Sequence, residues 1–143
     1  MADMRVVHEG DETLDEGETE RRVIATEVER ADTTLSQAKG LMFRSSLPDE
    51  YALVLEVGEG GFLSRGPSRH VVHMLFVRVP LDVVWLVDDE VIKTARMHPW
   101  RSIAMGRANR ILELPAGAAE GVQPGDTLRI ERADESLDES LDE

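Results

Sequence analysis

The sequence predicts a single, mainly β domain whose short antiparallel strands form a sandwich or a barrel-like sheet. Its 143 residues are enough for one domain with its own apolar core. From Val71 onward, apolar β-branched runs follow one another without an intervening helical pattern, which favours antiparallel pairing. Only one short segment, residues 35–44, has apolar residues at helical spacing. An α+β fold is the alternative.

The N-terminal half of the predicted domain contains a strand, a helix and a second strand. Residues 21–29 are rich in β-branched side chains that alternate with polar ones, which favours a strand. An Asp-Thr-Thr sequence can cap the one short helix, over residues 35–44. Residues 51–57 follow a Pro-Asp turn and are predicted to form a strand.

The C-terminal half is predicted to add five strands, which makes about seven in all. Residues 71–79 and 83–87 are almost continuously apolar, as strands are when both of their faces are covered. A polar Asp-Asp-Glu connection leads to a return strand. Residues 98–108 are expected to be irregular, because a proline and a glycine interrupt them. The last three strands are predicted at residues 91–97, 109–114 and 127–131.

Residues 111–126 (ILELPAGAAEGVQPGD) carry the densest turn signals in the chain. Pro115 can begin a helical turn over residues 115–120, and Gly121 suits the left-handed residue that ends it. The Pro-Gly pair at 124–125 is typical of a type II turn. We interpret these residues as specifying shape. The alternative is that a glycine here lets a ligand approach the backbone closely.

The formal net charge of −13 is concentrated at the two ends of the chain. Residues 1–20 hold eight acidic residues and one arginine, and residues 133–143 hold six acidic residues and no basic one. We therefore expect one neutral domain over residues 21–132 between a flexible acidic N-terminal segment and a disordered acidic tail. Acid excess with only two lysines suits a halophilic, archaeal cytoplasm, and equally a GC-rich genome without salt adaptation.

Composition also limits the location and the partners of the protein. No segment resembles a signal peptide or the roughly 20 apolar residues of a membrane span, so we expect a cytoplasmic protein without a membrane partner. The absence of cysteine excludes Cys-based zinc sites, and His70 and His73 would face opposite sides of a strand. We therefore expect no metal and no cofactor.

The net negative charge argues against nucleic acid as a binding partner. We expect the protein to be a monomer or a weak homodimer.

Three sequence blocks occur in an order typical of a known family. They are GLMFR at 40–44, VPLDVVW at 79–85, and LELPAG at 112–117 followed by Gly125-Asp126. This arrangement resembles the domain of unknown function 192 (DUF192) family of small archaeal and bacterial proteins. The resemblance covers about residues 24–131 and implies a compact, mostly β fold without an established activity.

One departure from the family pattern limits what the resemblance implies. Many members carry Trp-Met-Lys-Asn-Thr before the second block, whereas this chain has His-Met-Leu-Phe-Val at 73–77. Any role of that lysine and asparagine is therefore not carried over to this protein.

Four side chains are the candidate site residues, and they support two functional hypotheses. We favour a non-catalytic β module that binds a small anionic ligand or a protein partner, with Arg44, His73, Asp82 and Glu113 as candidate ligand-binding residues. The alternative is a hydrolase-like enzyme that acts on an anionic or sugar-like substrate with Asp82 and Glu113 as its catalytic pair. Asp82 could instead cap a turn by accepting backbone N–H bonds, and Glu113 could face solvent or pair with arginine.

Residues 61–112 carry a local charge opposite to that of the two ends. They hold eight basic and four acidic residues, and most of the bases are arginines. Since guanidinium groups match carboxylates and phosphates, this segment is either a mixed surface or an anion-binding face. A further hypothesis is that the acidic tails improve solubility and dock on this segment at low salt.

Overall fold

The computed structural model describes residues 4–13, 19–31, 46–56, 68–73 and 78–132, which form ten strands and no helix. A mainly β fold is therefore confirmed. The helix expected over residues 35–44 and the acidic tail at 133–143 lie outside the described residues. The strands are β1 (Met4–Thr13), β2 (Thr19–Ala25), β3 (Glu27–Ala31), β4 (Tyr51–Glu56), β5 (Ser68–His73), β6 (Leu81–Val87), β7 (Glu90–Met97), β8 (Ile103–Ala108), β9 (Arg110–Pro115) and β10 (Thr127–Arg132).

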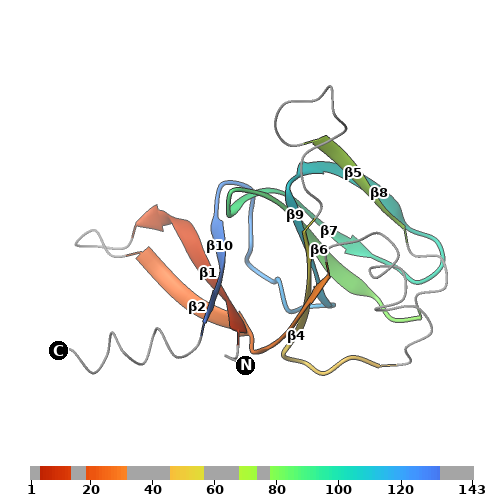
Figure 1. The fold of residues 1–143 in the computed structure, drawn as a ribbon, viewed down its shortest axis with the longest axis horizontal. Helices are drawn as coiled ribbons and strands as arrows, with labels where there is room; N and C mark the ends of the chain where they lie inside the picture. Colours follow the sequence, from red (N-terminus) through yellow and green to blue (C-terminus); the bar gives the residue numbers. More distant parts are fainter. Residues whose placement is uncertain (1–3, 14–18, 32–45, 57–67, 74–77, 133–143) are drawn as a thin grey trace.

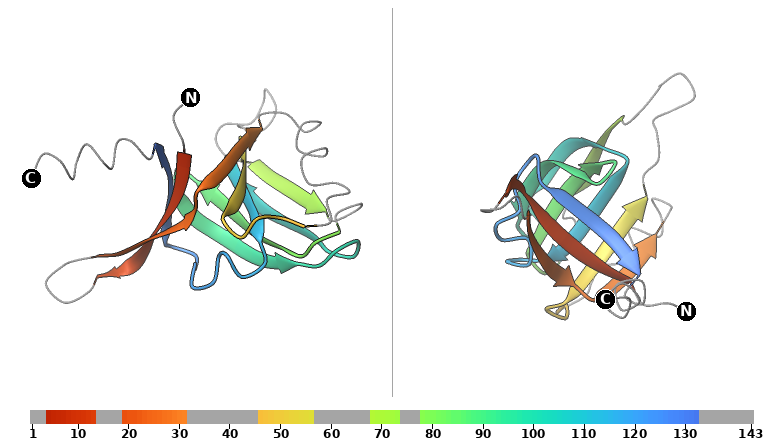
Figure 2. Two further views of the ribbon diagram at one scale, coloured as in Figure 1. Left: turned by 90° about the horizontal axis from the view of Figure 1, so that it is seen from below. Right: turned by 90° about the vertical axis from the view of Figure 1, so that its left-hand side faces the viewer.

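Eight of these strands form one sheet that curls into a barrel (Figures 1 and 2). The strand order is β2-β1-β10-β7-β6-β9-β4-β3. The two edge strands, β2 and β3, are consecutive halves of one segment that bends at Thr26. The carbonyl oxygen of Glu50 holds this bend by accepting hydrogen bonds from the backbone N–H groups of Thr26 and Glu27, both at 2.9 Å. Because the segment pairs with β1 before the bend and with β4 after it, the sheet closes on itself.

The central strands of the barrel bury apolar side chains on both faces. On β9, Leu112 and Leu114 belong to a core cluster inside the barrel, to which seven of the eight strands contribute buried residues. Ile111, next to Leu112 on the same strand, belongs to a second cluster on the outer face of β4, β9 and β6. Trp85 of β6 and Ala108 of β8 are fully buried members of this outer core. The near-continuous apolar runs of the sequence are thus explained by burial on both sides.

The ribbon formed by β5 and β8 covers the outer core (Figure 1). It packs closely because the indole ring of Trp85 lies against Gly106, where an added Cβ would be 2.7 Å from Cγ of Trp85. Lys93 of β7 also links Trp85 to the ribbon. Its Nζ lies 5.3 Å from the centroid of the Trp85 ring and donates a hydrogen bond to the carbonyl oxygen of Met105 at 2.8 Å.

The domain begins earlier in the chain than the sequence indicated. Residues 4–13 form β1, and its Val6 and Val7 are fully buried. The boundary expected at residue 21 therefore falls inside the sheet. The many acidic residues around positions 4–13 made a strand unexpected there. A strand can nevertheless accommodate them, because Glu9 pairs with Arg129 of β10 at 3.2 Å.

The hairpin predicted between residues 87 and 91 forms with a two-residue turn. Asp88 and Asp89 both have positive φ, at 49° and 72°, as a type I′ turn requires. Arg110 donates a hydrogen bond to the Asp89 carboxylate at 2.9 Å, and the Asn109 amide donates one to Asp88 at the same distance. These contacts offset the cost of the left-handed backbone.

The residues after β9 form the expected turns with one difference. Gly121 and Gly125 are left-handed, at φ of 87° and 97°, and a 3.0 Å backbone hydrogen bond closes the turn over residues 123–126. The helical turn expected over residues 115–120 is instead a succession of tight turns. Gly117 is responsible, because its φ of 97° leaves the right-handed helical region.

We predict that Gly106→Ala lowers the free energy of unfolding by about 1–3 kcal/mol, because the new methyl group would overlap the Trp85 ring. Gly10→Ala on β1 is the matched control, since nothing lies within 4 Å of an added Cβ there. Urea unfolding followed by tryptophan fluorescence measures both. Equal stability of the two variants would contradict the packing described for β8.

Candidate functional site

Asp82 anchors the turns that follow β9. It lies near the start of β6 and is buried. Its Oδ2 accepts hydrogen bonds from the backbone N–H groups of Gly117 at 2.9 Å and Ala119 at 3.1 Å. Its Oδ1 accepts one from Nε of Arg96 at 2.5 Å. Both carboxylate oxygens are thus engaged, as the turn-capping interpretation of the sequence predicted.

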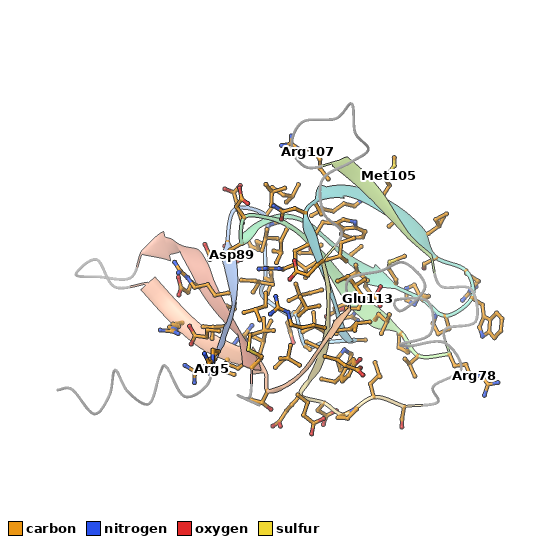
Figure 3. All side chains as sticks on the ribbon, in the orientation of Figure 1. Arg5, Arg78, Asp89, Met105, Arg107 and Glu113 are labelled. Atoms are coloured by element: carbon orange, nitrogen blue, oxygen red, sulfur yellow. The ribbon has the colours of Figure 1, made fainter. Side chains whose placement is uncertain are left out.

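Glu113 lies on the other face of the sheet, among apolar side chains (Figure 3). Its neighbours across the sheet are Leu53 of β4 and Val83 of β6, which both belong to the outer core. This burial raises the pKa of Glu113 to about 7. Among the described residues, no ion pair or hydrogen bond stabilises its charged form. The sequence led us to expect solvent exposure or pairing with an arginine, but Glu113 is not exposed, and it pairs with no arginine of the described residues.

The two carboxylates of the alternative, hydrolase-like hypothesis therefore do not come together. Asp82 pairs across the sheet with Leu114, which is inside the barrel, whereas Glu113 pairs with Val83 on the outside. A general acid and its partner carboxylate must flank the same bond. Asp82 and Glu113 point to opposite sides of one sheet, so they cannot act on one substrate.

The other two candidate residues are only partly described by the structure. Arg44 lies outside the described residues. His73 ends β5, where its backbone pairs with that of Ile103, and so belongs to the ribbon rather than to the barrel wall. Within the described ranges, no group of three or more histidine, cysteine or acidic residues could hold a metal ion.

An exposed apolar surface lies on and beside β8, in the segment that the sequence predicted to be irregular. We define the β8 face as Trp100, Ile103 and Met105 together with Arg101 and Arg107. The side chains of Trp100, Ile103 and Met105 are 48%, 71% and 47% exposed. They are three of the five large apolar residues that are exposed in the described part of the chain. Three large exposed apolar residues close together in sequence make this segment a candidate interaction surface.

The β8 face arises from an unusual alternation along the strand. Ile103, Met105 and Arg107 are exposed, while the alanines and the glycine between them face the barrel. Figure 3 shows Met105 and Arg107 on the side of the ribbon away from the barrel. The signal was present as alternating large and small residues. It was missed because Gly106 was interpreted as a strand breaker.

The β8 face carries two arginines that have no ion-pair partner in the described part of the chain. Arg101 and Arg107 are exposed, and neither forms an ion pair within the described residues. By contrast, arginines on β1, β2 and β10 pair with Glu9 and Glu131. The β8 face thus combines three exposed apolar residues with two guanidinium groups that have no acidic partner in the described structure.

Fold and surface together define a small β-barrel protein that a two-stranded ribbon covers on one side. The chain belongs to the DUF192 family, described as "Uncharacterized ACR", which it matches over residues 15–130. This confirms the resemblance seen in the sequence blocks. No curated protein matches the chain. In the described residues, no helix is long and apolar enough to cross a membrane.

Two solved structures are similar to this protein. One, from Sinorhizobium meliloti 1021, is described as a "putative transcription regulator"; it is 22% identical, with a TM-score of 0.66, over 90% of this chain and 95% of that one. The other is a protein of unknown function from Novosphingobium aromaticivorans DSM 12444. It is 29% identical, with a TM-score of 0.64, over 87% of this chain and 83% of that one. At this level of identity, the first shows a shared fold alone.

We predict that Asp82→Ala lowers the free energy of unfolding by about 2–5 kcal/mol, because two backbone N–H groups lose their acceptor. Arg96→Ala should cost about 1 kcal/mol or less, since its side chain is 51% exposed. Guanidinium unfolding of the two variants distinguishes the backbone bonds from the ion pair. Similar losses in both would show that the ion pair, rather than the turn anchor, is the main role of Asp82.

We predict that Glu113 makes stability depend on pH. The folded-state pKa of Glu113 is about 7, whereas its ordinary pKa is 4.5. Between these two pH values the folded protein keeps a proton on Glu113 that the unfolded chain has lost, so stability falls as pH rises from 4.5 to 7. Glu113→Gln should therefore gain stability relative to the natural protein, by at most roughly 3 kcal/mol, between pH 4.5 and 7.5. Unfolding curves at several pH values measure this difference. Glu27→Gln, which removes an exposed carboxylate on β3, is the control, and identical profiles for both variants would refute the prediction.

Proposed function

We propose that this protein is a cytoplasmic, non-catalytic module that binds a protein partner through the β8 face. The observation that carries the proposal is the exposure of Ile103 and Met105 on a strand whose small residues already satisfy the packing of the barrel, with exposed Trp100 in the turn before this strand. Aromatic residues, methionine and arginine are enriched in protein interfaces. The β8 face combines all three types.

The arrangement of the carboxylates supports a non-catalytic role. Asp82 is engaged by backbone N–H groups, and Glu113 lies on the opposite face without a partner group among the described residues. A small anionic ligand is a weaker explanation of the β8 face, because binding to its arginines would leave the apolar centre in water. Nucleic acid is weaker still, since two arginines and a net charge of −13 attract a phosphate backbone poorly.

The chemistry of the β8 face also specifies the kind of partner. An apolar side chain of the partner would cover Ile103 and Met105, and its carboxylates would reach Arg101 and Arg107. Guanidinium groups form strong, often bidentate hydrogen bonds with carboxylates. We therefore propose a partner segment in which apolar and acidic residues are close together in sequence.

Site-specific crosslinking tests the proposal, because the chain has no natural cysteine. Ile103→Cys, labelled with a photoreactive maleimide, should form discrete protein adducts in an extract of the source cells. Val23→Cys on β2, at a position 44% exposed, is the matched control and should not form them. Adding Met105→Asp to the Ile103→Cys chain should reduce the adducts about tenfold or more, since a charge at the centre of an interface removes at least about 1.4 kcal/mol of binding. Equal adducts from positions 103 and 23 would refute the β8 face as the binding surface.

A further inference from the structure

We infer that the acidic C-terminal segment of a second copy of this chain, residues 133–143, binds the β8 face. The inference rests on the proposed function, because it names an occupant for the same surface. The contact would be weak and reversible, formed by a short segment on a small apolar area.

The first argument is charge complementarity. Residues 133–143 (ADESLDESLDE) contain six acidic residues and no basic one. Arg101 and Arg107 border the β8 face and have no ion-pair partner in the described structure. Carboxylates bind guanidinium groups in a matching geometry, and contacts between exposed charges weaken as salt rises. The pairing is therefore expected to be salt-dependent.

The second argument is that the segment also supplies apolar side chains at a suitable spacing. Leu137 and Leu141 are its large apolar residues, and they are four residues apart. In one helical turn, such residues have Cβ atoms about 5–6 Å apart. Ile103 and Met105, two residues apart on a strand, are separated by roughly 6.5–7 Å. The Ser-Leu-Asp-Glu repeat also has the pattern of a capping box, which would favour a helical turn in the bound segment.

The third argument concerns which copy supplies the segment. The described chain ends at Arg132 of β10, which pairs with Met4 of β1. In Figure 1 this end of β10 lies on the side of the barrel away from the β5–β8 ribbon. Eleven residues reach at most about 36–40 Å when fully extended, and part of that length would be used in binding. The segment of the same chain would have to cross the barrel first, whereas a second copy can approach the β8 face directly.

Disulfide exchange between full-length variants tests the inference. Chains with Ile103→Cys and chains with Ser140→Cys are mixed in a glutathione redox buffer, and the disulfide-linked species are counted by non-reducing electrophoresis and mass spectrometry. Random pairing gives twice as many mixed dimers as dimers of either kind. We expect the mixed dimer to exceed this proportion about fivefold at low salt and to approach it at high salt.

Two controls separate a specific contact from charge attraction alone. Val23→Cys replaces Ile103→Cys at an exposed position that follows Arg21 and Arg22, and it should give random pairing with Ser140→Cys. Leu137→Ser with Leu141→Ser in the Ser140→Cys chain keeps every charge and should also return pairing to random. Circular dichroism of each variant verifies that the fold is retained.

The outcomes distinguish this inference from the proposed function. Random pairing of Ile103→Cys with Ser140→Cys would overturn the inference, and the proposed function would still stand if photocrosslinking from position 103 captured another protein. A chain carrying both substitutions could instead form an internal disulfide at concentrations where no dimer forms. That result would assign the occupant to the chain's own segment and would overturn the role of a second copy.

Discussion

The central strands of the barrel are covered on both faces, and the rest of the structure follows from this constraint. Apolar residues of β4, β9 and β6 fill the barrel on one side and form the outer core on the other. A polar side chain on these strands must then find fixed partners or lose its charge. Asp82 is satisfied by backbone donors of a nearby turn. Glu113 has no such partner among the described residues, and its burial raises its pKa.

The need to cover the outer core explains the small residues on the inward side of β8, but it does not explain the large apolar residues on the outward side. Trp85 fills the space beneath the ribbon, so position 106 must be glycine and its inward neighbours must be small. Nothing in this packing requires large apolar residues on the outward side. Polar residues at 103 and 105 would preserve the same contacts with Trp85 and would be better solvated. Packing beneath the ribbon therefore does not account for the exposed isoleucine and methionine.

The parts of this fold that the sequence predicted are those governed by local rules. The apolar runs at 83–87 and 91–97, the turn between them and the left-handed Gly121 and Gly125 all follow from neighbouring residues. The missed features depend on distant partners. β1 pairs with β10 at the other end of the chain, and β8 pairs with β5 and packs on Trp85 of β6. Alternation correctly directed Glu113 away from its two leucine neighbours. However, the one-residue offset that separates it from Asp82 became visible only with the register of β6 and β9.

The distribution of charge links the neutral domain to its acidic ends. Within the described barrel, acidic residues meet arginines in pairs, such as Glu56 with Arg110 at 3.0 Å and Glu131 with Arg5 at 2.6 Å. Burial raises the pKa of Glu56, but hydrogen bonds and charges of Arg30 and Arg110 outweigh it, and the net direction is downward. The β8 face keeps its guanidinium groups without such partners in the described structure. Because residues 21–132 carry equal numbers of acidic and basic residues, the excess acid of this chain lies outside them. The β8 face carries unpaired arginines in the described structure, and residues 133–143 carry acid without a base, so the two are complementary in charge.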